Sequence, residues 1–81
     1  MTIDVLFFAG IKEALGQAHR VLEVSEGACI GEVIDQMSRE ADGHVLKTIP
    51  LVFAVNEYFE SGNRELKDGD RLAVMTAMSG G

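Results

Sequence analysis

The chain carries from residue 29 the stretch Cys29-Ile30-Gly31-Glu32-Val33-Ile34-Asp35-Gln36-Met37-Ser38-Arg39-Glu40-Ala41, its longest run with a helical period. The apolar residues recur at positions i, i+3, i+4, i+7 and i+11, which line one face of an α-helix. They are Ile30, Val33, Ile34, Met37 and Ala41. Charged and amide residues occupy the opposite side, so this helix needs one apolar surface to pack against, and a sheet is the simplest candidate.

The ends of this helix are predicted from local signals. Cys29 followed three residues later by Glu32 has the spacing of a capping box, although a thiol accepts hydrogen bonds more weakly than the usual hydroxyl. Gly43 is the predicted C-cap, because glycine adopts the left-handed conformation in which many helices end.

The segments on both sides of the helix favour short strands, since they are rich in β-branched and aromatic residues and end in turn signals. The predicted strands are 3–9, 20–24, 51–55, 58–59 and 71–76. Gly10 and Gly16 bracket one short helical turn, and Asn56-Glu57 is a predicted tight turn. The order β, β, α, β, β, β predicts an α+β fold of the β-grasp, or ubiquitin-like, kind. We expect a mixed sheet of four to five strands, with the first and last strands parallel and central and one main helix across one face.

The two faces of this sheet differ in their predicted environment. The residues expected beneath the helix are Ile3, Val5, Phe7, Leu51, Phe53, Val55, Leu72 and Val74. The opposite face would carry an apolar cluster, Leu6, Phe8, Ala73 and Met75, with Val52 and Ala54 nearby. An exposed cluster of this kind usually marks an interaction surface, so these residues are the predicted partner-binding site. The alternative is that segment 10–15 or 42–49 folds over the cluster.

Composition narrows the possible functions. The chain has 81 residues, 7 Lys and Arg, 13 Asp and Glu and a net charge of -6, which argues against nucleic-acid binding. One cysteine excludes an intramolecular disulfide, and neither a secretory signal nor a membrane span is visible, so we expect a cytoplasmic protein. At this length there is room for one small core and little room for an active-site cavity.

Few side chains suggest chemistry of their own. His19 and His44 have no cysteine or carboxylate at ligand spacing, so no metal site and no cofactor are expected. Cys29 is favoured as a helix cap over a reactive thiol, because no base or second cysteine is near it in sequence. The motifs of nucleotide-binding loops, zinc proteases and serine hydrolases do not occur.

The last three residues are Ser79-Gly80-Gly81, shortly after the last predicted strand. We expect residues 1–76 to form the domain and residues 77–81 a flexible tail. Glycine has no side chain to block a narrow channel, so such a tail can carry a terminal carboxylate into a partner's buried site. A tail without any function is the alternative, and the tail alone does not decide between the two.

Several motifs together resemble the small subunit of molybdopterin synthase, a family of ubiquitin-like sulfur carriers. They are Val5-Leu6-Phe7-Phe8-Ala9, Leu15-Gly16, Ala54-Val55-Asn56, Leu66-Lys67-Asp68-Gly69-Asp70 and Ser79-Gly80-Gly81. The resemblance runs from about residue 3 to the last residue. One departure lies before the tail, where the family commonly has two prolines and this chain has Thr76-Ala77-Met78.

The resemblance implies that Gly81 is adenylated by an ATP-dependent adenylyltransferase of the ubiquitin-activating type. A persulfide protein would supply the sulfur that converts Gly81 to a thiocarboxylate. The large subunit of molybdopterin synthase would then accept the tail, supply the catalytic side chains and transfer the sulfur to cyclic pyranopterin monophosphate, in an assembly that the family resemblance makes a heterotetramer. Two alternatives stay within the carrier class: a sulfur carrier for thiazole, cysteine or tRNA thiolation, and a ubiquitin-like modifier. A third is a non-catalytic binding module.

Overall fold

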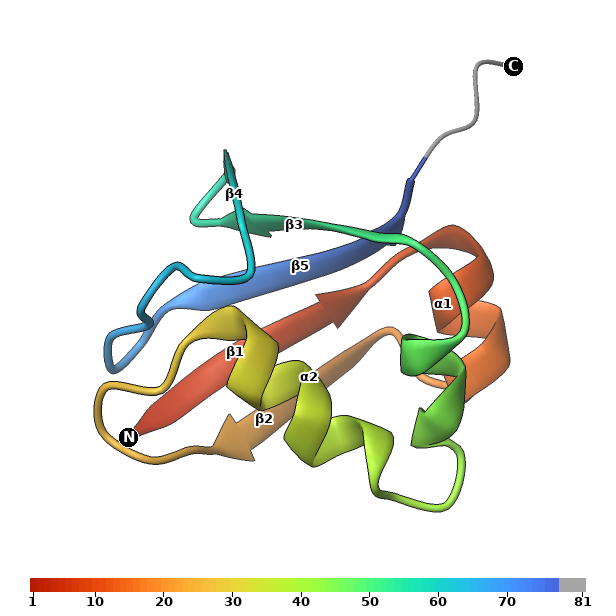
Figure 1. The fold of residues 1–81 in the computed structure, drawn as a ribbon, viewed down its shortest axis with the longest axis horizontal. Coiled ribbons are helices and arrows are strands. Elements are labelled where there is room, and N and C mark those ends of the chain that lie inside the picture. Colours follow the sequence, from red (N-terminus) through yellow and green to blue (C-terminus); the bar gives the residue numbers. More distant parts are fainter. Residues whose placement is uncertain (78–81) are drawn as a thin grey trace.

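A computed structural model describes residues 1–77 of the chain (Figure 1). The elements in chain order are β1 (Thr2–Phe7), α1 (Ala9–Leu15), β2 (His19–Glu23), α2 (Ile30–Ser38), the 3-10 helix η1 (Gly43–Lys47), β3 (Leu51–Val55), β4 (Tyr58–Glu60) and β5 (Arg71–Thr76). The five strands form one sheet in the order β2-β1-β5-β3-β4. β1 and β5 are parallel and every other neighbouring pair is antiparallel. The β-grasp prediction is therefore confirmed, including the central parallel pair.

The core lies between the sheet and α2, which crosses one face of the sheet (Figure 1). The residues that α2 buries are Ile30, Val33, Ile34 and Met37. The strands bury Ile3, Val5, Phe7, Val55, Leu72 and Val74 against them, while Leu51 and Phe53 are only partly buried at the margin. Each fully buried side chain of this size contributes about 1.5–3 kcal/mol, so this one layer supplies most of the stability available to so short a chain.

The predicted end of α2 is wrong. The helix stops at Ser38 with Arg39 as its C-cap, and Ala41 is exposed outside it. Gly43 is buried at the start of η1, where a Cβ atom would come within 1.8 Å of the Met37 carbonyl oxygen. Glycine is needed here for a close approach of two backbone segments rather than to end the helix.

Segment 8–16 differs from its prediction at one end only. The first strand stops at Phe7, because the Phe8 carbonyl accepts hydrogen bonds from the amides of Ile11 and Lys12 and so begins α1. The helix ends as predicted at Gly16, which has a φ of 70°. Ile11 is fully buried in the core, so α1 is anchored on the same side of the sheet as α2.

The β3–β4 turn is held to the start of β5 by hydrogen bonds of Asn56. Asn56 and Glu57 both have positive φ, 49° and 77°, as a two-residue hairpin turn requires. Asp70 is 7% exposed and accepts hydrogen bonds from the Lys67 amide (2.7 Å) and the Asn56 side-chain amide (3.0 Å). The Asn56 side-chain oxygen in turn accepts from the Arg71 amide at 3.0 Å. One buried carboxylate thus fixes the loop that leads into the central strand.

Among residues 1–77, no helix is both long enough and apolar enough to cross a membrane.

We expect Asp70→Ala to lower the free energy of unfolding by about 1–3 kcal/mol, because two donors lose their buried acceptor. Chemical denaturation monitored by circular dichroism measures the change. Asp42→Ala is the matched control, since Asp42 is exposed and makes no capping hydrogen bond. Equal stability of the Asp70 variant and wild type would show that the network does not hold the loop.

Candidate functional site

The face of the sheet opposite α2 carries a continuous apolar surface, which we call the outer face. Strand pairing sets Leu6 opposite Ala73, Ala73 opposite Ala54 and Ala54 opposite Phe59, so one row crosses four strands. A second row places Val52 opposite Met75, with Phe8 following the end of β1 beside them. The outer-face patch consists of Leu6, Phe8, Val52, Ala54, Phe59, Ala73 and Met75.

No helix of residues 1–77 covers this patch, although its neighbours bury Ala54 to 8% exposure. Phe8 is 45% exposed and Phe59 is 76% exposed, while Leu6 and Met75 are half-buried among their neighbours. The segments that were the alternative cover direct their apolar side chains elsewhere: Ile11 of α1 and Leu46 of η1 lie in the core with α2. The structure thus brings the four predicted binding residues together and leaves them accessible.

Phe59 is the residue of this patch that the sequence analysis missed. A signal for it was present, because a two-residue turn at Asn56-Glu57 pairs Ala54 with Phe59 and places both on one face. The neighbouring Tyr58 pairs with Val55, so its side chain belongs to the opposite side of β4, where it is 75% exposed.

Charged residues border the patch at one end. Asp4 of β1 lies opposite Arg71 of β5, two residues before Leu6 and Ala73 and therefore on the same face. The Asp4 carboxylate approaches His19 of β2, with 3.4 Å between Oδ1 and Nε2. The outer face therefore carries charged residues at the start of β5, with the exposed Val21 of β2 beside Asp4, and is apolar toward the end of β5.

The chain leaves the sheet beside the apolar end of the outer face. The Ala77 amide donates a hydrogen bond to the Pro50 carbonyl at 3.1 Å, which continues the β3–β5 ladder one residue beyond Thr76. The predicted tail residues Ser79, Gly80 and Gly81 lie outside the described residues, so their role and the boundary between domain and tail stay predictions.

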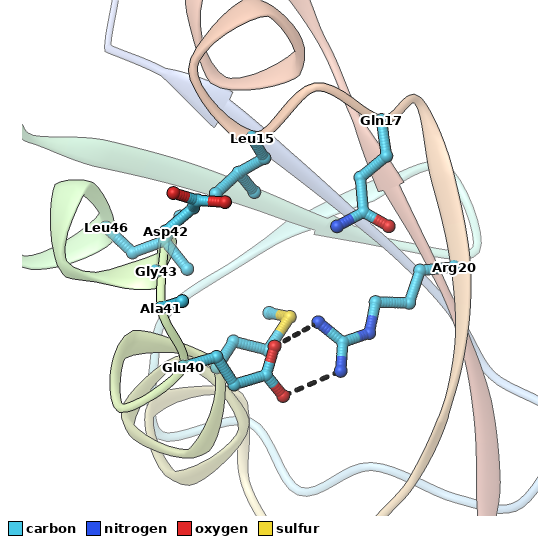
Figure 2. A pocket seen from close by; sticks show the side chains of 9 residues that line it. Leu15, Gln17, Arg20, Glu40, Ala41, Asp42, Gly43 and Leu46 are labelled. Carbon is cyan, nitrogen blue, oxygen red and sulfur yellow. Dashed lines mark hydrogen bonds and ion pairs between the residues drawn. The ribbon is translucent and has the colours of Figure 1, made fainter.

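A small cavity opens on the other side of the molecule, between α1, β2 and the segment after α2 (Figure 2). Its volume is about 220 Å³, below the 300–1,000 Å³ of typical ligand pockets. Arg20 and Glu40 point toward each other across it and form two hydrogen bonds of 2.5 and 2.7 Å. This contact lowers the pKa of the Glu40 carboxyl and raises that of the Arg20 guanidinium, so both groups stay charged and satisfied. The Arg20–Glu40 pair therefore closes on itself, and Asp42 is the other acidic side chain of the cavity lining.

The remaining candidate residues lie at a helix cap or are exposed to solvent. The Glu32 carboxylate accepts a hydrogen bond from the Cys29 amide at 3.0 Å and completes the predicted capping box. His19 is exposed on β2 and His44 is exposed on η1. Among residues 1–77, no three His, Cys, Asp or Glu side chains converge as metal ligands.

Comparison with known proteins finds a matching family and solved structures with the same fold. The model of the ThiS family matches residues 5–81. The molybdopterin synthase sulfur carrier subunit of Chlamydomonas reinhardtii is 38% identical over 85 residues, which cover 100% of both chains. SAMP1 of Haloferax volcanii has the same fold, with a TM-score of 0.83, 18% identity and full coverage of both chains. Subunits 1 and 2 of the molybdopterin-converting factor from Helicobacter pylori form a complex whose matching chain has a TM-score of 0.70, 21% identity and full coverage of both chains.

Proposed function

The chain belongs to the ThiS family of sulfur carriers, and from that premise we propose that it is the sulfur carrier subunit of molybdopterin synthase in molybdenum cofactor biosynthesis. The observation that carries the proposal is the full-length similarity to a molybdopterin synthase sulfur carrier subunit. The outer-face patch lies beside the point where the tail begins, which is where a carrier needs a surface for its partner.

Gly81 is the reactive residue of this proposal. A carboxylate is a poor electrophile, so an ATP-dependent adenylyltransferase first converts the Gly81 carboxylate to an acyl adenylate, which has AMP as its leaving group. The outer sulfur of a protein persulfide then displaces AMP and forms an acyl disulfide with Gly81. A second thiol reduces that acyl disulfide, which releases the Gly81 thiocarboxylate and leaves the two donor sulfurs joined as a disulfide. The thiocarboxylate sulfur goes to cyclic pyranopterin monophosphate.

The large subunit supplies the catalytic side chains in this scheme. The cavity beside Arg20 and Glu40 has a volume of about 220 Å³, too small for a typical substrate pocket, and the backbone stays bound to β3 as far as Ala77. Four residues follow Ala77, and an extended chain of four spans about 13–14 Å. That reach is enough to carry the Gly81 carboxylate into a partner's active site.

The outer-face patch is the docking surface of the proposal. An apolar surface next to the tail can bind the adenylyltransferase and then the large subunit, because each must hold the domain while the tail reacts. Two carriers and two large subunits would form the heterotetramer that we propose, and the acidic chain with its single cysteine would work in the cytoplasm.

Other sulfur-carrier routes and protein modification use the same fold and are the alternatives. The likeness to SAMP1 rests on 18% identity and therefore shows the fold alone. Affinity purification of the chain from its source tests the pathway directly. Copurification of a molybdopterin synthase large subunit supports the proposal, and copurification of a thiazole synthase or a set of conjugated proteins would replace it.

We expect deletion of Gly81 to abolish thiocarboxylate formation and sulfur transfer without changing the free energy of unfolding by more than about 0.5 kcal/mol. The reason is that the described core is built from residues between Ile3 and Val74. Intact-mass measurement after co-expression with the adenylyltransferase follows the exchange of one oxygen for sulfur in wild type. Sulfur exchange in the truncated chain would place the reactive group elsewhere.

We expect Phe59→Asp to weaken binding of the large subunit at least tenfold, because a charge would replace an exposed aromatic side chain of the patch. Phe8→Asp should act in the same direction. Isothermal titration calorimetry measures the dissociation constants. Tyr58→Asp is the matched control, since Tyr58 is equally exposed but belongs to the other side of β4. Equal losses for the Phe59 and Tyr58 variants would contradict docking through the outer face.

A further inference from the structure

Arg71 is the one Lys or Arg residue on the outer face of the five strands. Three other cations of the chain are paired with acids: Arg20 with Glu40, Lys47 with Asp35 and Arg64 with Glu60. Arg71 is exposed and forms no ion pair with any of residues 1–77, although Asp4 is its neighbour across the β1–β5 ladder. The Asp4 carboxylate turns to His19 on the far side of β1 instead.

The backbone of Arg71 is held firmly. Its amide donates to the Asn56 side-chain oxygen at 3.0 Å, and its carbonyl accepts from the Asn56 amide at 2.9 Å. Asn56 is itself bonded to the buried Asp70. The guanidinium therefore extends from an ordered backbone. Binding it costs less conformational entropy than binding an arginine on a flexible loop, whose backbone would also have to be ordered.

The position of Arg71 along β5 relates it to the tail. Every second residue of β5 lies on the outer face, namely Arg71, Ala73 and Met75. Because a strand rises about 3.4 Å per residue, Met75 lies about 13–14 Å from Arg71. The chain leaves the sheet just beyond Met75, at Ala77. A protein that covers the patch and receives the tail thus meets a cation at the far end of the same strand.

Contact with a partner makes this cation costly unless it is neutralised. A charge desolvated without a counter-charge is strongly unfavourable. Asp4 lies opposite Arg71 on that face, but its carboxylate approaches His19 rather than Arg71. The planar guanidinium can bind both oxygens of one carboxylate, a geometry that a lysine lacks. We propose that Arg71 is a specificity residue of the docking surface, and that the protein bound to the outer face presents an Asp or Glu carboxylate to it. This inference rests on the proposed function.

A charge-removal pair tests the contribution to binding. We expect Arg71→Gln to raise the dissociation constant of the complex with the copurified large subunit about tenfold and to make it less sensitive to NaCl. The Michaelis constant for the thiocarboxylated carrier should rise with kcat unchanged, because the residue is remote from Gly81. Arg39→Gln removes the same charge at the end of α2, on the other side of the sheet, and should change neither constant.

A cross-linking pair tests the carboxylate itself. In the Arg71→Lys variant, a carbodiimide should join the new amine to the partner's carboxylate through an amide bond, and peptide mass spectrometry identifies the acidic residue. Arg39→Lys should give no such bond. A cross-link at position 71 to a partner Asp or Glu supports the proposal.

Failure of this inference differs from failure of the proposed function. If wild type does not bind the large subunit at all, the proposed function fails. If wild type binds and transfers sulfur while Arg71→Gln binds equally well at every salt concentration, the proposed function stands and the role of Arg71 is overturned. A variant that loses stability but keeps its dissociation constant would assign Arg71 to an internal pair with Asp4 and would equally overturn the proposal.

Discussion

The parallel pairing of β1 with β5 is the interaction on which the rest of the structure depends. It brings the first and last strands of the chain together at the centre of the sheet and sets Val5 beside Leu72 on the side of α2. The same register sets Leu6 beside Ala73 on the outer face. One pairing therefore builds the core, forms the middle of the outer-face patch and brings Ala77 to the same end of the sheet as Phe8.

The short chain explains why the two faces differ. α2, α1 and η1 all commit their apolar side chains to one face, and no further described element remains to cover the other. The largest exposed aromatic side chains, Tyr58 and Phe59, both lie on the short edge strand β4. In the proposed function, this one-core domain contributes by carrying its C-terminal carboxylate to a partner that holds the active site.

Local patterns predicted much of this fold because they reflect short-range physics. The bounds of β3 and β5 and the turn at Asn56-Glu57 follow from alternation and turn chemistry, and the structure reproduces them. The end of α2 was mispredicted because Gly43 is there to let the backbone approach the Met37 carbonyl closely. No local sequence pattern encodes that contact. Phe59 could be assigned to the patch only once the strand register was known. The unpaired state of Arg71 among residues 1–77 could be recognised only once the structure showed the Asp4 carboxylate near His19.

A single-turnover assay tests the central claim most directly. The thiocarboxylated chain is mixed with the large subunit and cyclic pyranopterin monophosphate, and molybdopterin is measured together with the mass of the carrier. We expect molybdopterin to form as the Gly81 thiocarboxylate returns to a carboxylate. Molybdopterin formation while the thiocarboxylate stays intact, or a complete lack of transfer from a properly bound carrier, would contradict it.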